Sequence, residues 1–434
     1  MDKTVSFHTL GCKVNQYETQ AMTELFENAG YKVLSFDSIC DVYVVNTCTV
    51  TGTGDKKSRQ IIRRCQSLNP DAVIVVAGCY SQVAPQEISA MGVDVVLGNK
   101  DKSNVVALTE EAISGKKSNE VADILKCRAF EDMSISGFND KTRAFVKIED
   151  GCNSFCTYCI IPYARGPVRS RDIESIVDEV KNLSENGFTE VVLTGIHIAS
   201  YGLDIKESEL TLYDVISRVH EVEGIKRIRL GSIEPRILTE DFVKKISALP
   251  KVCDHFHISL QSGCDDTLKR MNRKYDTALY RQVVKNIREY MPQSAITTDI
   301  MVGFPGETDE EFKTSMAFLE EICFAESHVF AYSNRKGTKA DKLPCQIKRK
   351  DKNIRASQMA EAAKRCREKF LNGFVGKKIE VLFEREVEGS IYEGHTSNYI
   401  KVHVPSDKDI SRKFVNVRID KVFDEYVFGE ICDN

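Results

Sequence analysis

The sequence predicts an α/β protein of three parts: an amino-terminal doubly wound α/β domain, a central partial barrel of six β/α units, and a small carboxyl-terminal antiparallel β-barrel. Three observations support this fold class. Short apolar runs alternate with helical patterns up to residue 119, six longer strand–helix units follow, and period-two alternation begins past Gly373. We expect domains at residues 1–119, 138–369 and 370–434, about three domains for a chain of 434 residues.

In the first part, continuous apolar strands separated by helical patterns are typical of a parallel sheet covered on both faces. Strands are expected at residues 5–10, 31–36, 42–46, 72–77 and 93–97, and helices at 16–29 and 56–68. The polar stretch 114–141 is interpreted as a linker.

In the central part, strands are expected at residues 144–148, 191–194, 228–230, 255–260, 296–302 and 328–332, with helical patterns such as 173–183 and 310–322 between them. Six units are fewer than the eight that close a full barrel, so we predict an open one with its chemistry at the carboxyl ends of the strands. Alternating strands at 378–383, 399–404 and 414–419 then predict the small antiparallel barrel.

The amino-acid composition excludes several classes of protein for this sequence. The chain has 60 Lys and Arg against 64 Asp and Glu, which excludes a uniformly basic surface but allows a local basic face. No apolar stretch reaches the roughly 18 residues of a membrane-spanning helix, and the start lacks a signal-peptide pattern. Fifteen cysteines, an odd number, favour reduced thiols in the cytoplasm over a disulfide framework, with some of them binding metal.

The strongest chemical signal is GCNSFCTYC, which holds Cys152, Cys156 and Cys159 in one short loop. No fourth Cys or His follows nearby, which disfavours a structural zinc site with its usual four ligands. A cluster of four irons held by three thiolates keeps one iron open for a substrate or cofactor. The alternative, a packed loop of inert thiols, fits three cysteines in eight residues poorly.

A second set of cysteines is spread along the first domain. Cys12, Cys48 and Cys79 each follow an expected strand, and the carboxyl ends of parallel strands line one edge of a sheet. These thiols can therefore meet at one point. Buried cysteine is also common in such cores, so the residues alone leave ligand and packing roles level.

The motifs resemble those of a known family. Cys152, Cys156 and Cys159 match the CxxxCxxC motif of radical S-adenosylmethionine (SAM) enzymes, including the aromatic Tyr158 before the last cysteine. With TLGCKVNQYET at 9–19, NTCTVT at 46–51 and AGCY at 77–80, the whole chain resembles a radical SAM methylthiotransferase ending in a TRAM-type β-barrel.

This resemblance implies two 4Fe-4S clusters. One is implied on the Cys152 loop, where the open iron binds SAM, and an auxiliary cluster is implied on Cys12, Cys48 and Cys79. The resemblance further implies that a 5′-deoxyadenosyl radical is formed from SAM and that the auxiliary cluster presents the sulfur. Acid–base side chains cannot do this chemistry, so we single out no catalytic side chain.

Within the family, LGCKVNQYE resembles the branch acting on N6-threonylcarbamoyladenosine (t6A) of tRNA, whereas the isopentenyladenosine branch usually reads YGCQMN and the ribosomal-protein branch LGCPKN. The resemblance implies conversion of t6A at position 37 to 2-methylthio-t6A. It also implies as partners a tRNA anticodon stem-loop, a sulfur donor and a low-potential electron donor. The alternatives are isopentenyladenosine tRNA, a ribosomal protein, or a non-catalytic RNA-binding iron–sulfur protein.

Candidate SAM-binding residues lie at the ends of the central strands. Glycine allows close backbone approach to a ligand, and hydroxyl or carboxylate groups can bind ribose or an amino group. The residues are Tyr158 beside the cysteines, and Gly195, Ser232, Glu234 and Gln261 after successive strands. Ordinary strand-to-helix turns with capping Ser or Thr are the alternative, and for single residues the two readings are about level.

Two basic segments are candidates for RNA contact. One is the helix after Cys48, with Lys56, Lys57, Arg59, Arg63 and Arg64; the other is residues 339–369, with 11 Lys and Arg against 4 Asp and Glu. A solvated helical face is the common alternative meaning of such a charge run.

Overall fold

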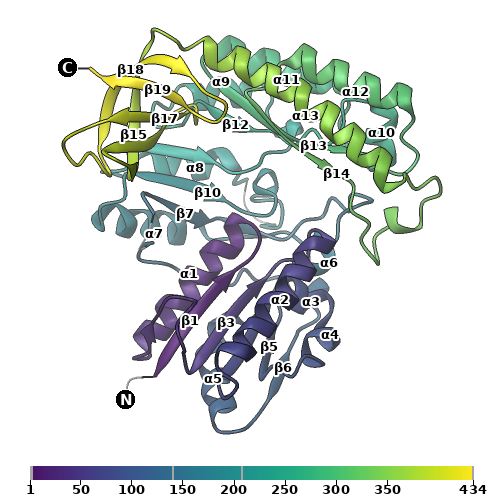
Figure 1. Ribbon diagram of the computed structural model, residues 1–434, viewed down its shortest axis with the longest axis vertical. Coiled ribbons are helices and arrows are strands. Elements are labelled where there is room, and N and C mark those ends of the chain that lie inside the picture. The colour runs from purple at the N-terminus through teal and green to yellow at the C-terminus, as the bar shows by residue number, and fades with distance from the viewer. Residues whose placement is uncertain (1–2, 139–140, 207–208, 433–434) are drawn as a thin grey trace.

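The computed structural model describes residues 3–138, 141–206 and 209–432, which form three packed units (Figure 1). The amino-terminal unit lies at one end of the molecule. The central strands lie above it, and the small β-barrel packs beside them.

A six-stranded parallel sheet forms the amino-terminal unit, in the order β2-β1-β3-β4-β5-β6. Helices α1 and α5 cover one face, where Val42 and Val44 pack with Phe26. Helices α2, α3 and α4 cover the other face, where Val45 packs with Ile62. The elements are β1 (Thr4–Thr9), α1 (Lys13–Asn28), β2 (Lys32–Val33), β3 (Val42–Thr47), α2 (Gly52–Leu68), β4 (Val73–Gly78), α3 (Cys79–Val83), α4 (Pro85–Ser89), β5 (Val95–Leu97), η1 (Lys102–Asn104), α5 (Val105–Ile113) and β6 (Ser118–Glu120).

The segment 114–141, expected to be a polar linker, is instead built into the fold. Strand β6 extends the amino-terminal sheet beside β5, and a short helix η2 (Ile124–Lys126) follows. Further on, Met133, Ile135 and Phe138 are buried in the core of the central unit. The prediction failed because these apolar side chains are isolated between polar ones, so their burial leaves no periodic pattern.

Six parallel strands form the central unit, as predicted. Strands β7, β10 and β11 form one sheet and β12, β13 and β14 another, joined by single bridges such as Ile233 to Ile258. Among the described residues β7 and β14 do not pair, so the barrel is open. Strand bounds are β7 (Arg143–Lys147), β10 (Glu190–Thr194), β11 (Arg227–Leu230), β12 (His255–His257), β13 (Ala295–Val302) and β14 (Glu326–Ala331), with a small antiparallel pair β8 (Glu149–Asp150) and β9 (Arg169–Ser170).

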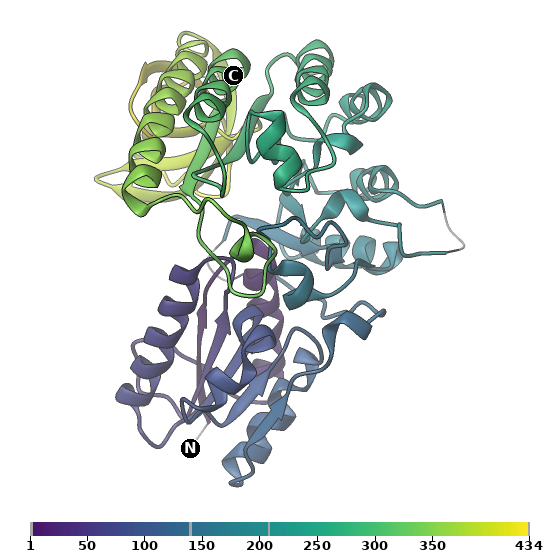
Figure 2. The same ribbon diagram turned by 90° about the vertical axis from the view of Figure 1, so that its right-hand side faces the viewer.

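The central unit also contains helices, of which the longer ones cover the outside of these strands. The helices of this unit are α6 (Ile161–Arg165), α7 (Ile173–Glu185), η3 (Ile198–Ser200), α8 (Leu212–His220), η4 (Pro235–Ile237), α9 (Glu240–Ser247), α10 (Asp265–Arg270), α11 (Thr277–Tyr290), α12 (Asp309–Ile322), η5 (Ala340–Lys342) and α13 (Arg349–Asn372). Figure 2 shows the loop around η5 lying against the amino-terminal unit. None of the helices in the described part of the chain is long and apolar enough to cross a membrane.

The last unit is a closed five-stranded barrel, β15 (Lys378–Glu388), β16 (Ile391–Thr396), β17 (Lys401–Pro405), β18 (Phe414–Val422) and β19 (Val427–Ile431). Its core contains Val381, Phe383 and Val417. The barrel was expected to be antiparallel, but β17 and β19 pair in parallel. Strand β19 fills the gap between β17 and β18, an arrangement that strand alternation alone does not reveal.

Candidate functional site

The cysteine loop of the central unit lies between β8 and α6. Its backbone is fixed by hydrogen bonds from Cys152 N–H to the Gly166 carbonyl at 3.0 Å and from Thr157 N–H to the Met271 carbonyl at 3.0 Å. Gly151 has φ +88°, and a Cβ there would lie 2.0 Å from the Pro167 carbonyl oxygen, so only glycine fits. The loop is therefore a rigid support for its three thiols.

N–H donors surround these sulfurs. Ser154 N–H lies 3.4 Å from the Cys152 sulfur, and Arg273 Nη1 lies 3.2 Å from the Cys156 sulfur. Burial raises the pKa of Cys152, and that of Cys159 to about 12, and the neighbouring thiols add to both shifts. The three thiols thus form one group whose donors fit cluster-bound sulfur, since such hydrogen bonds tune iron–sulfur centres.

The second set of cysteines meets at the edge of the amino-terminal sheet. Cys48 and Cys79 directly follow β3 and β4, and Cys12 follows β1 after two residues; the three strands are neighbours in the sheet. A Cβ on Gly11 would lie 3.1 Å from the Cys48 sulfur, and one on Gly78 would lie 2.5 Å from Asn46 Oδ1. Glycine at both positions lets the loops approach one another.

Donors also face this second group of thiols. Arg165 Nε lies 3.3 Å from the Cys79 sulfur and Asn99 Nδ2 lies 3.4 Å from it. Burial raises the pKa of Cys12, and that of Cys48 to about 11. The set of thiols and donors fits a second iron–sulfur cluster, because bound sulfur accepts the N–H groups that are present.

Arg165 belongs to a buried charge network that joins two units. Glu18 on α1 accepts from Lys102, from Lys147 at 2.8 Å, and from Arg165, with all four side chains almost fully buried. Burial opposes ionisation of Glu18, but the three cations outweigh it and hold its pKa well below the usual range. Asp150 accepts from Lys147 at 2.8 Å and from Arg165 at 3.2 Å. The network holds Arg165 against Cys79.

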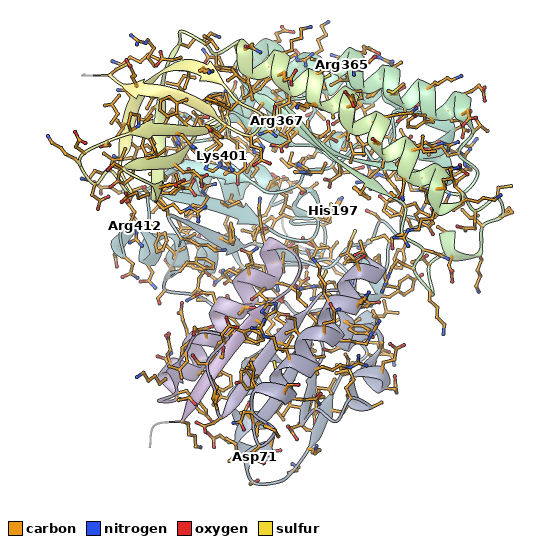
Figure 3. All side chains as sticks on the ribbon, viewed as in Figure 1. Asp71, His197, Arg365, Arg367, Lys401 and Arg412 are labelled. Carbon is orange, nitrogen blue, oxygen red and sulfur yellow. The ribbon has the colours of Figure 1, made fainter. Side chains whose placement is uncertain are left out.

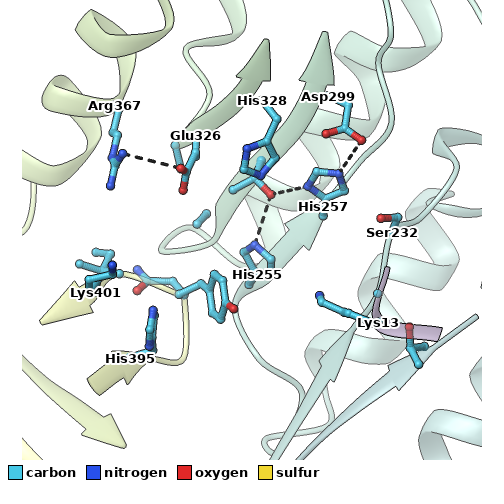
Figure 4. A pocket seen from close by; sticks show the side chains of 18 of the residues that line it. Lys13, Ser232, His255, His257, Asp299, Glu326, His328, Arg367, His395 and Lys401 are labelled. Atoms are coloured by element: carbon cyan, nitrogen blue, oxygen red, sulfur yellow. Dashed lines mark hydrogen bonds and ion pairs between the residues drawn. The ribbon is translucent and has the colours of Figure 1, made fainter. Parts of the chain in front are cut away.

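A cavity of about 930 Å³ lies where the three units meet (Figure 4). Three sequence-predicted residues line it, Cys12, Gly195 and Ser232. Figure 3 shows Arg367 and Lys401 between the β-barrel and α13. Other residues that line the cavity include Lys13, Thr194, His255, His257, Asp299, Glu326, His328, Arg367, His395, Tyr399 and Lys401.

The other predicted SAM-binding residues lie elsewhere, and Tyr158 is part of the first cysteine loop. Tyr158 packs edge-on against Phe304 with ring centroids 6.4 Å apart. Glu234 is paired with Arg236 at 2.7 Å. Gln261 has φ +67° and pairs with β13 through its backbone. None of the three predicted residues lines the large cavity.

Two residues beside Gly195 were not predicted from the sequence. Glu149 is buried, its Oε2 atom accepts from His197 N–H at 2.7 Å, and burial raises its pKa well above the usual range. Neither Glu149 Oε1 nor His197 Nε2 has a hydrogen-bond partner among the described residues. A Cβ on Gly195 would lie 2.7 Å from Glu149 Oε2. Unpaired buried polar atoms at a glycine fit the amino-acid end of SAM.

The sequence signal for Glu149 was weak, because a single acidic residue at the end of a strand is common. Lys13 and Arg165 were also missed as site residues, although Lys13 lies inside TLGCKVNQYET and Arg165 follows the GCNSFCTYC motif by six residues. The pKa of the Lys13 amine is lowered to about 8, mainly by burial and in smaller part by the positive charges of Arg229 and Arg143. Arg165 is distinguished by its ion pairs and Lys13 by the surrounding charges, and both depend on residues far apart in the sequence.

Comparisons with known proteins cover the whole chain. The radical SAM superfamily matches residues 146–319, and the uncharacterized protein family UPF0004 matches residues 4–98. The threonylcarbamoyladenosine tRNA methylthiotransferase MtaB of Bacillus subtilis is 42% identical over 98% of this chain and 96% of its own. MtaB of Aquifex aeolicus is 39% identical over 96% of this chain and 100% of its own.

Two further similarities are more distant. The tRNA-2-methylthio-N(6)-dimethylallyladenosine synthase of Clostridium botulinum is 34% identical over 97% of this chain and 95% of its own. The solved structure of the radical S-adenosylmethionine methyltransferase TsrM from Kitasatospora setae has a TM-score of 0.55 at 16% identity, covering 76% of this chain and 75% of that one. At that identity the structural likeness concerns the fold alone.

Proposed function

Because this chain belongs to the radical SAM methylthiotransferase family, we propose that it converts t6A at position 37 of tRNA to 2-methylthio-t6A. The contact between Arg165 and Cys79 is the observation that carries this proposal. Arg165 ends α6, the five-residue helix that begins two positions after Cys159. Such a helix is roughly 7.5 Å long, so α6 together with the Arg165 side chain connects the two groups of cysteines.

The family uses SAM and a 4Fe-4S cluster, for which Cys152, Cys156 and Cys159 are the proposed ligands. We infer a second cluster on Cys12, Cys48 and Cys79. When bound, these groups supply the electron and the radical chemistry that an unactivated aromatic C–H bond requires. The sulfur and the electrons come from separate donors.

The residues of the chain bind and orient the reactants. We propose that Gly195 leaves room for the amino-acid end of SAM, while Glu149 and Ser232 accept or donate hydrogen bonds there. Tyr158 provides an aromatic face, supported by its packing on Phe304. Arg273 holds the Cys156 sulfur and also donates to Tyr275 at 2.9 Å, which fixes its own orientation.

For tRNA, we propose that helix α2 contacts the anticodon stem-loop in the cytoplasm. Lys56, Lys57, Arg63 and Arg64 are exposed on this helix, which begins four residues after Cys48. The second basic segment offers fewer free cations than its composition suggests. Ion pairs already engage Arg355, Lys364, Arg365 and Arg367.

The test is a reconstituted reaction with SAM, dithionite, a sulfide source and an anticodon stem-loop carrying t6A. We expect 5′-deoxyadenosine together with 2-methylthio-t6A, measured by mass spectrometry of the nucleosides. A matched stem-loop carrying N6-dimethylallyladenosine serves as the control. Modification of the control alone would overturn the t6A assignment, and absence of 5′-deoxyadenosine would favour a non-catalytic RNA-binding iron–sulfur protein.

A further inference from the structure

Lys13 occupies an unusual position in the large cavity. It begins helix α1 directly after Cys12, and its side chain is half-buried. Figure 4 shows it extending into the cavity between His255 and Ser232. No carboxylate in the described ranges 3–138, 141–206 and 209–432 lies within ion-pair distance of its Nζ atom.

The other Lys and Arg side chains that line this cavity have partners. Arg367 pairs with Glu326 at 3.6 Å, and Lys401 pairs with Glu393 at 3.7 Å. Lys13 is therefore the one lining Lys or Arg, within the described part of the chain, that lacks an acidic partner.

The charges that act on Lys13 make this arrangement unfavourable in the free protein. Arg229 and Arg143 add positive charge at this end of the cavity, and the Cys12 thiol and Glu190 oppose it as smaller influences. Both arginines pair with Glu190, at 2.9 Å and 3.5 Å. Glu190 is thus engaged by other cations. A half-buried ammonium without a counter-ion is costly, and an anion brought by a ligand offsets that cost.

We propose that Lys13 binds the carboxylate of the N6-threonylcarbamoyl group and thereby selects t6A over adenosines with uncharged N6 substituents. This inference rests on the proposed function. The threonyl part of t6A carries one carboxylate, and among the described residues Lys13 is the one Lys or Arg lining the cavity without an acidic partner. N6 and C2 both lie on the Watson–Crick edge of adenine, so the substituent and the carbon to be modified enter the same part of the cavity.

Two further observations agree with this assignment. Lys13 is adjacent to Cys12, a proposed ligand of the auxiliary cluster, so a bound carboxylate would hold the base beside that cluster. Lys13 is also the charged position of LGCKVNQYE, where the YGCQMN motif has an uncharged glutamine. A dimethylallyl substituent offers nothing that would pair with an ammonium.

The experiment compares two stem-loops, one carrying t6A and one in which the same carboxylate is converted to its primary amide. For Lys13→Gln we expect kcat/KM on the t6A stem-loop to fall about 10- to 100-fold, the range for loss of a charged hydrogen bond. The amide stem-loop should lose less than about threefold, because it has no charge to pair. Lys13→Arg should keep the preference for the acid.

Lys401→Gln is the matched control, because Lys401 lines the same cavity but is already paired with Glu393. It should change both stem-loops by the same factor. Iron content is measured for every variant, since Lys13 adjoins Cys12. Stem-loop affinity by fluorescence anisotropy gives the same acid-to-amide comparison without turnover if iron is lost.

The outcomes separate the two proposals. Equal loss on both stem-loops with Lys13→Gln, in turnover and in affinity, would overturn the role of Lys13 while leaving the proposed function intact. Failure of the unaltered protein to modify the t6A stem-loop would overturn the proposed function and the role of Lys13 with it.

Discussion

Arg165 donates a hydrogen bond from Nε to the sulfur of Cys79 at 3.3 Å, although the two residues belong to different units of the fold. The same guanidinium also donates to Glu18 and to Asp150. One side chain therefore links the helix after the first cysteine loop to the proposed site of the auxiliary cluster.

Replacing Arg165 with Lys should destabilise the protein and the auxiliary cluster together. Lysine cannot reach Cys79, Glu18 and Asp150 at once, and removing one partner from a buried charge network costs about 3–5 kcal/mol. We expect iron to fall from about eight toward about four atoms per chain. Iron analysis and chemical denaturation check this. Arg281→Lys, in an exposed pair with Glu321, should change the free energy of unfolding by less than about 1 kcal/mol.

The two groups of cysteines should be separable by substitution. Changing Cys12, Cys48 and Cys79 to Ala should remove about half the iron while SAM cleavage to 5′-deoxyadenosine continues. The triple Ala variant of the Cys152 loop should remove the other half and abolish cleavage. Cys127→Ala is the control and should keep all the iron. Unchanged iron in the first variant would refute the auxiliary site.

Arg335, in the loop after β14, contacts both the loop that carries Cys48 and the start of helix α2. It donates to Asp55 at 2.6 Å and to Thr49, and the Thr49 hydroxyl donates to Asp55 at 2.8 Å. Arg335→Met should lower the free energy of unfolding by about 2–4 kcal/mol, because Asp55 is left largely buried without its cation. It should also raise the ratio of 5′-deoxyadenosine to methylthiolated product. Arg218→Met, which breaks an exposed pair with Glu174, should leave that ratio unaltered.

Helix α2 should contribute to tRNA affinity through phosphate contacts. Lys56→Glu combined with Lys57→Glu should weaken binding, and should lower the slope of log K against log salt by about 1.4–1.8 if each lysine meets one phosphate. Filter binding at several salt concentrations measures both quantities. Lys244→Glu on α9 is the control, and an equal effect there would contradict a specific role of α2.

The lowered pKa of Glu190 leads to a prediction of how the free energy of unfolding depends on pH. Burial alone would raise its pKa, but Arg229 and Arg143 outweigh burial and hold the pKa below the usual value of 4.5. The ionised carboxylate therefore stabilises the fold fully above about pH 4.5, and this contribution declines as the pH falls further. The difference in unfolding free energy between cluster-free wild type and Glu190→Gln should shrink from pH 7 to pH 4. A difference that grows on acidification would disprove the assignment.

Local hydrophobic patterns were sufficient to predict the positions of most strands. All six central strands lie within a few residues of the expected ranges, because continuous apolar runs report burial on both faces of a parallel sheet. The same reasoning failed for 114–141, where Met133 and Ile135 are buried singly. It also missed the parallel pairing of β17 with β19, since alternation predicts a strand but not its neighbour.

The motifs by themselves predicted the class of chemistry, since three thiols in eight residues are typical of a metal-binding loop wherever that loop lies. Only the folded chain decided which charges are satisfied. Arg165 contacts Glu18 across 147 positions, and no carboxylate in the described part of the chain pairs with Lys13, while Glu190 pairs with arginines. Hydrophobic periodicity can be read from residues that are close in sequence. Whether a buried charge has a partner depends instead on groups that only tertiary packing brings together.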